Sequence, residues 1–186
     1  MRHGFKAQSE RTAAAARIAL GLKSHAPLDP WVFAAHLKVK VLEFQTLGLP
    51  VRTARQLTVI DGDSWSAMTL QVDGVFAIVI NPAHAITRQR SDLMHELAHI
   101  ELRHSPARVE VSATGLLLLS DYSDEQEQEA DWLAAAFLLP REGLVRFRAA
   151  RKSTGEIATH YGVSESLCEW RLRMTGVDVQ MRRAHS

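Results

Sequence analysis

The order of apolar and polar residues divides the N-terminal part of the chain into two helices and a strand. An alanine-rich stretch predicts a surface helix over residues 9–22 that packs through Ile18 and Leu22. Asp29 followed by Pro30 has the form of an N-cap and a first helical position, so a second helix is expected there. The alternation in KVKVLEF then predicts a half-buried strand over residues 39–44.

The stretch QLTVIDGDSWSAMTLQVDGVFAIVIN contains three short β-like runs. The dipeptides Asp61-Gly62 and Asp73-Gly74 separate them, and both accept the positive φ angles of tight hairpin turns. The last run, VFAIVIN, is almost wholly apolar, which is typical of a strand covered on both faces. These features predict a small antiparallel sheet with helices packed against it.

The second half of the chain has helical spacing. Apolar residues from Thr87 onward predict a helix of about four turns that ends before Pro106. After an irregular region that includes SATGLLLLSDYS, Ser123 or Asp124 is expected to cap a helix that runs to Pro140. Its apolar face consists of Ala130, Leu133, Ala134, Phe137 and Leu138. The remainder is helical, and GEIATHYGVSESLCEWRL has the form of a helix-turn-helix.

Composition places the chain among globular proteins. Of its 186 residues, 46% are hydrophobic and 23% charged, and the formal net charge is +1, so no global field attracts nucleic acid. The lone Cys168 cannot form an intramolecular disulfide, which fits a reducing cytoplasm. The basic N-terminus precedes an apolar run, but Arg17 interrupts that run and no cleavage site follows, so we expect no signal peptide. No apolar run reaches the roughly eighteen residues of a membrane span.

The stretch SDLMHELAHIELRH places His95 and His99 four residues apart on the predicted helix, with Glu96 beside the first. Residues at this spacing lie one above the other, so both imidazoles can bind one cation at about 2.0–2.1 Å. Glu96 is about 100° round the helix from His95, within reach of a water molecule at the metal, as a catalytic base requires. A polar helix edge is the alternative interpretation, so the chain must supply a third ligand.

The acidic helix after Ser123 offers that third ligand. Glu127 lies on the stripe of Ala130 and Ala134, whereas Glu129 points about 100° away, so helical geometry favours Glu127 and leaves Glu129 as the alternative. Asp131, one turn after Glu127, is placed to accept the second N–H of a ligating histidine. The simpler interpretation is an acidic first turn that complements the helix dipole.

Other polar residues are weaker candidates. His104 follows His99 by five residues, one fewer than the metzincin spacing requires, and is interpreted as a histidine at a helix C-terminus. Tyr122 or His160 could stabilise an oxyanion, although a structural role is the more common one for such residues.

The combination of LMHELAHIELRH and EQEADWLAAAFLLP resembles the ImmA/IrrE metallopeptidases, and PLDPWVFAAHLKVKVLE and IATHYGVSESLCEWRLRMTG extend the resemblance over most of the chain. Asp131 stands where Asn is common, and Trp132-Leu133 replace the usual residue and Phe. The resemblance implies His95, His99 and Glu127 as metal ligands and Glu96 as catalytic base.

The fold that follows from these observations is α+β: a zincin-like metallopeptidase domain over residues 1–140, with a small antiparallel sheet, and a helical, helix-turn-helix-like extension over 141–186 packed on it. The expected cofactor is Zn²⁺, although Mn²⁺, iron or cobalt suits the same ligands. By the resemblance, the substrate is a helix-turn-helix repressor whose cleavage turns on mobile-element or stress-response genes.

A DNA-binding or interaction protein that uses residues 153–175 is the rival class. Glu165 and Glu169 lie near the start of the second helix of that segment, where contacts to DNA favour basic or amide side chains. We therefore expect no direct binding of nucleic acid.

Overall fold

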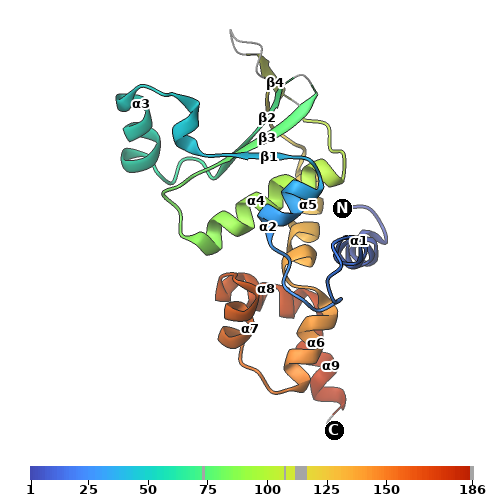
Figure 1. Cartoon of the computed structure of the whole chain (residues 1–186). Coiled ribbons are helices and arrows are strands. Elements are labelled where there is room, and N and C mark those ends of the chain that lie inside the picture. The colour runs from blue at the N-terminus through green and yellow to red at the C-terminus, as the bar shows by residue number, and fades with distance from the viewer. Residues whose placement is uncertain (73, 107, 112–116, 185–186) are drawn as a thin grey trace.

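The fold is a mixed α+β arrangement in which a sheet packs against a group of helices (Figure 1). The computed structural model describes residues 1–72, 74–106, 108–111 and 117–184. The strands are β1 (Lys40–Leu42), β2 (Ala67–Val72), β3 (Val75–Ile80), β4 (Arg108–Val111) and β5 (Leu117–Ser120). The α-helices are α1 (Phe5–Ala19), α2 (Pro30–His36), α3 (Val51–Arg55), α4 (Ile86–Glu101), α5 (Asp124–Leu138), α6 (Arg141–Ala149), α7 (Thr154–Tyr161), α8 (Glu165–Thr175) and α9 (Val177–Ala184). Two short segments of other helical type are η1 (Phe44–Leu47) and η2 (Gln56–Ile60).

The sheet has five strands in the order β1-β3-β2-β5-β4. Strands β2 and β3 form the predicted antiparallel hairpin, in which Gly74 has φ 78°, while Asp73 of that turn lies outside the described residues. The small antiparallel sheet that was predicted is in fact mixed, because β1 pairs with β3 in parallel while the other strand pairs are antiparallel. Strands β4 and β5 were also not predicted; β5 belongs to the region expected to be irregular, of which residues 112–116 lie outside the described part.

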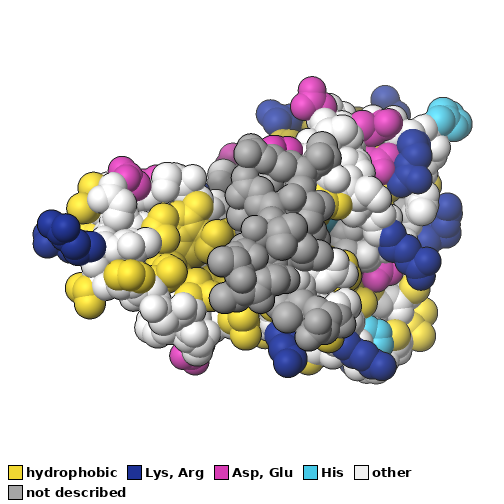
Figure 2. Space-filling model, turned by 90° about the horizontal axis from the view of Figure 1, so that it is seen from above, with side chains coloured by type: hydrophobic (Ala, Val, Ile, Leu, Met, Phe, Trp, Pro, Cys, Tyr) yellow, Lys and Arg dark blue, Asp and Glu magenta, His cyan; other side chains and the backbone are white. Residues whose placement is uncertain are grey.

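The first of the three predicted β-like runs is helical. Residues Gln56–Ile60 form η2, a π-helical continuation of α3, and the indole N–H of Trp65 donates to the carbonyl of Leu57 at 2.9 Å. The Asp61-Gly62 dipeptide therefore ends a helix and does not join two strands. Strand propensity depends on cross-strand neighbours, and this run pairs with no described strand. Val59 and Ile60 are consequently exposed, and Figure 2 shows hydrophobic side chains gathered towards one end of the molecule.

Helix α1 begins earlier than predicted and packs through different residues. Its buried stripe is Phe5, Ser9, Ala13 and Arg17, whereas Ile18, which was expected to pack, is exposed. The buried guanidinium of Arg17 donates to the carbonyls of Ala13, Ala26 and Phe137, so main-chain acceptors satisfy it.

Helices α4 and α5 form the centre of the molecule. The sheet covers one side of α4, and α5 packs against another (Figure 1). Both helices were predicted closely because their boundaries are local: α4 ends before Pro106, and Ser123 caps α5 in a capping box with Gln126. All five residues predicted for the apolar face of α5 are buried, as are Leu93, Met94, Leu97 and Ala98 of α4. The two helices thereby present fixed faces to each other.

The C-terminal helices pack on this centre. Leu144, Ile157 and Leu172 belong to the same buried cluster as Phe5 and Leu97. Helices α7 and α8 are joined by three residues that begin with Gly162, whose φ is 65°. Cys168 is buried. Within the described part of the chain, no helix combines the length and the apolar character that a membrane span requires.

Candidate metal centre

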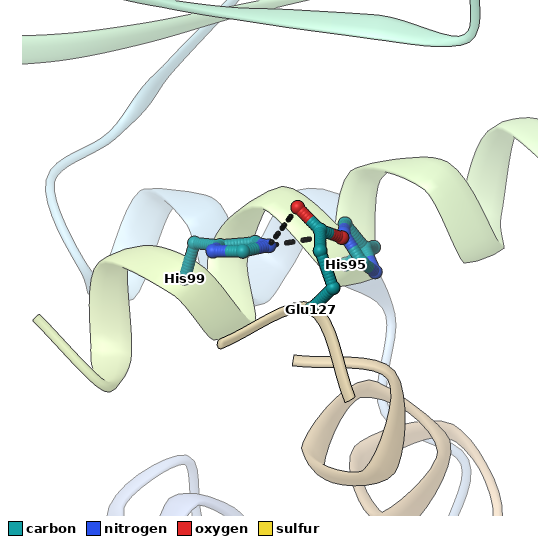
Figure 3. A group of neighbouring side chains, drawn as sticks. All are labelled: His95, His99 and Glu127. Atoms are coloured by element: carbon teal, nitrogen blue, oxygen red, sulfur yellow. Dashed lines mark hydrogen bonds and ion pairs between the residues drawn. The ribbon is translucent and has the colours of Figure 1, made fainter. Parts of the chain in front are cut away.

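The two histidines of the motif lie on one face of α4. Their rings are 4.7 Å apart between centroids, and His95 Nε2 is 3.0 Å from His99 Nε2 (Figure 3). The spacing of four residues places the rings one turn apart, as expected. His99 is 2% exposed, while part of the His95 ring remains accessible. Two ring nitrogens therefore converge on one point at the edge of the helix.

Glu127 reaches this point from the first turns of α5. Its Oε2 lies 3.1 Å from His95 Nε2 and its Oε1 lies 3.7 Å from His99 Nε2, so the carboxylate faces both rings (Figure 3). One ligand atom from each of the three residues fits within 4.8 Å of the others, and among the described residues this is the group that could hold a metal ion. The donor set of two imidazoles and one carboxylate suits Zn²⁺ with an open fourth position.

The two neighbouring acids of α5 have different partners. Asp131 Oδ1 lies 3.0 Å from His95 Nδ1, the nitrogen that faces away from Glu127, as the sequence predicted. Glu129, the alternative ligand, is turned away from the His95 and His99 pair. It is 3% exposed and accepts hydrogen bonds from Arg2 at 2.7 and 2.8 Å. The structure thus brings Glu127, and not Glu129, to the two motif histidines.

Without a metal, His95, His99 and Glu127 favour the binding of one proton, which lies on His95. Burial disfavours the charged His95 imidazole, but hydrogen bonds to Asp131 and Glu127 outweigh it and raise the pKa of His95 to about 10. Burial and the neighbouring positive charge of His95 lower the pKa of His99 to about 4. The hydrogen bond with His95 lowers the pKa of Glu127. The surroundings therefore favour a positive charge at this position. At neutral pH that charge is on the protonated imidazole of His95.

Glu96 lies beside the histidines and faces the sheet. Its Oε2 accepts a hydrogen bond from the hydroxyl of Thr69, a residue of β2 that is 2% exposed. Burial raises the pKa of the Glu96 carboxyl, and the Thr69 hydrogen bond opposes that shift. Sequence reasoning did not identify Thr69, because only the packing of α4 against β2 brings the two residues together.

Of the three weaker candidates, Tyr122 and His104 contact His99, whereas His160 lies elsewhere. Tyr122 stacks on His99 with ring centroids 3.8 Å apart, and burial raises the pKa of its phenol to about 12, so the hydroxyl remains a donor. His160 lies on α7 against Phe147 and Tyr161, and among the described residues its ring contacts involve no residue of the site. His104 contacts His99, with their Nδ1 atoms 3.1 Å apart, so its interpretation as a plain helix-terminal histidine was incomplete.

A helical His-Glu-x-x-His with a carboxylate from a second helix is the arrangement of a metallopeptidase. In agreement, the chain matches the IrrE N-terminal-like domain of the Peptidase_M78 family over residues 58–173, more than half of its length, and it belongs to that family. The match includes α4, α5 and the C-terminal helices as far as α8. No curated protein and no solved structure is significantly similar to the chain.

Proposed function

We propose that the chain is a zinc-dependent endopeptidase in which His95, His99 and Glu127 bind the metal and Glu96 is the catalytic base. The observation that carries the proposal is the convergence of three ligand atoms from α4 and α5 within 4.8 Å, with Glu96 adjacent. When bound, the metal would supply Lewis acidity towards a peptide carbonyl and make a water molecule more acidic. Mn²⁺, iron or cobalt could occupy the same ligands.

Glu96 would accept a proton from water and pass it to the leaving amine. Burial raises the pKa of this carboxyl, which brings it closer to neutral pH and makes it a better base than an exposed glutamate. The Thr69 hydroxyl holds one carboxylate oxygen of Glu96, and the other would face the substrate. Tyr122, protonated and stacked beside His99, is the better placed of the two oxyanion candidates.

For the fold, we propose a zincin-like core over residues 1–140 and a helix-turn-helix-like extension over 141–186. The family suggests a protein substrate. By its resemblance to ImmA/IrrE metallopeptidases, we propose a helix-turn-helix repressor as that substrate, cleaved in the cytoplasm.

A direct test is to incubate the purified chain with the repressor encoded nearest to it, with and without a chelator. We expect cleavage that the chelator abolishes. The Glu96→Gln variant should keep the metal and the fold but lose about 10²- to 10⁴-fold in cleavage rate, because an amide cannot accept the proton. Cleavage by Glu96→Gln at the parental rate would assign the proteolysis to another residue or protein.

Zinc titration tests the ligand assignment. Glu127→Gln should abolish tight zinc uptake, whereas Glu129→Gln should retain the metal with a smaller loss of affinity. The opposite order would overturn the choice of Glu127.

A DNA-binding regulator is the less supported alternative. In α8 the basic Arg171 is fully buried and donates to the carbonyl of Leu139, while Glu165 and Glu169 are exposed. The exposed acidic residues in the first turns of that helix oppose contact with phosphates there, although Arg173 in its last turn is also exposed. Tight, sequence-selective and salt-dependent binding in a mobility-shift assay would favour the alternative.

A further inference from the structure

His104 faces the side of His99 that points away from Glu127. Arg103, two residues after the end of α4, has φ 53°, and the backbone N–H of His104 donates to the carbonyl of His99 at 3.0 Å. This turn folds the chain back, so that the two rings meet edge to face with centroids 5.0 Å apart. The Nδ1 atoms lie 3.1 Å apart, and the His104 side chain is only 6% exposed.

The other nitrogen of His104 faces Glu129. His104 Nε2 lies 3.5 Å from Glu129 Oε2, and the same carboxylate accepts bonds from Arg2 through its backbone N–H, its Nε and its Nη2. Arg2 therefore holds the Glu129 carboxylate in place beside His104 Nε2.

The proton positions on His99 and His104 follow from which nitrogen of each ring can donate and which can accept a hydrogen bond. If His99 gives its Nε2 lone pair to a metal, its proton must be on Nδ1, which faces His104 Nδ1. His104 Nδ1 must then accept, so the proton of a neutral His104 lies on Nε2, the nitrogen 3.5 Å from Glu129 Oε2. The opposite polarity would leave the Glu129 carboxylate without this proton and place a proton on His99 Nε2, where it would block a metal. The Glu129 carboxylate, whose oxygens accept from the Arg2 guanidinium, is an acceptor, so it favours the first arrangement.

We propose that His104 is a positioning residue that, anchored by Glu129 and Arg2, sets the tautomer and orientation of His99 for metal binding. The inference rests on the proposed function, because it requires His99 to be a ligand. It gives Glu129 a role at the site without making it a ligand, in parallel with the contact between Asp131 and His95. Arg2, far from the motif in sequence, belongs to the same support.

The test compares two substitutions of His104 that differ in hydrogen-bonding ability. The His104→Phe variant fills the space of the imidazole but has no hydrogen-bond acceptor. The His104→Gln variant offers an amide oxygen to the N–H of His99 Nδ1. Zinc affinity is measured by competition with a chromophoric chelator, and the visible absorption of the Co²⁺-loaded protein reports ligand geometry. His36→Phe, at an exposed histidine of α2, is the matched control.

We expect His104→Phe to lose about ten- to a hundredfold in zinc affinity and to change the Co²⁺ spectrum. His104→Gln should recover most of the affinity, and His36→Phe should match the parent. Arg2→Met, which alters a partly exposed side chain, should weaken zinc binding by less than about tenfold and keeps the test decisive if His104→Phe fails to fold.

The outcomes distinguish this inference from the proposed function. If the parent binds neither zinc nor cobalt, the metal centre itself is wrong. If the parent binds both but His104→Phe has parental affinity and spectrum, the positioning role is overturned while the ligands stand. Equal losses in His104→Phe and His104→Gln, or unchanged affinity in Arg2→Met, would also overturn it.

Discussion

Metal uptake should displace one proton from His95, and its pH dependence can be worked out from the structure. With a pKa of about 10 in the metal-free chain, His95 is protonated at pH 7, whereas His99, with a pKa of about 4, is neutral. Glu127 is ionised, because its pKa is lowered. Only the His95 proton therefore stands between the ligands and a metal.

The free energy needed to remove the His95 proton sets how strongly zinc affinity depends on pH. Three pH units between pH 7 and the pKa, at about 1.36 kcal/mol each, reduce the apparent binding free energy by about 4 kcal/mol. Apparent zinc affinity should rise by about tenfold for each pH unit between pH 6 and 8, with release of about one proton per metal. Zinc affinity increases with pH because the metal binds to the deprotonated form of His95.

The assay is chelator competition at pH 6, 7 and 8, combined with calorimetry in two buffers of different ionisation enthalpy, which counts released protons. Asp131→Asn serves as the comparison. It replaces a carboxylate that raises the His95 pKa, so it should release less than one proton at pH 8 and give a shallower slope. A flat pH profile without proton release in the parent would refute the reasoning, and release of two protons would mean that His99 is also protonated.

Three further predictions concern orientation, pH and packing. Asp131→Ala should weaken zinc binding by about ten- to a hundredfold after correction for proton competition, and unchanged affinity would mean that Asp131 does not orient His95. The free energy of unfolding of the metal-free protein, measured in urea, should fall as pH rises from about 6.5 to about 10. The pKa of His95 is raised in the folded state, so the stabilisation by protonated His95 is complete only below the pKa of the unfolded state. Gly143→Ala should cost about 1–3 kcal/mol in unfolding free energy, because a new Cβ would lie 1.9 Å from the hydroxyl oxygen of Tyr161, which is held by the carbonyl of His25. A parental melting temperature for that variant would contradict the predicted clash.

The helices were more predictable than the sheet, because their signals are local. Asp29 caps α2 and Ser123 caps α5 through bonds to residues two or three positions away, so the sequence alone shows where each helix begins. Strand formation depends on partners that are distant in the chain. The β-like run at Gln56–Ile60 became helical, and Leu117–Ser120 formed β5 by pairing with β2 and β4.

The candidate site divides in the same way. The sequence by itself determined that His95 and His99 share one helix face with Glu96 beside them, because an α-helix repeats every 3.6 residues whatever surrounds it. Helical phase also favoured Glu127 over Glu129. Only the tertiary structure decided that Thr69 supports Glu96 and that Arg2, Glu129 and His104 stand behind His99. These contacts join residues from different elements, and burial and charge act between elements only once the chain has packed them together.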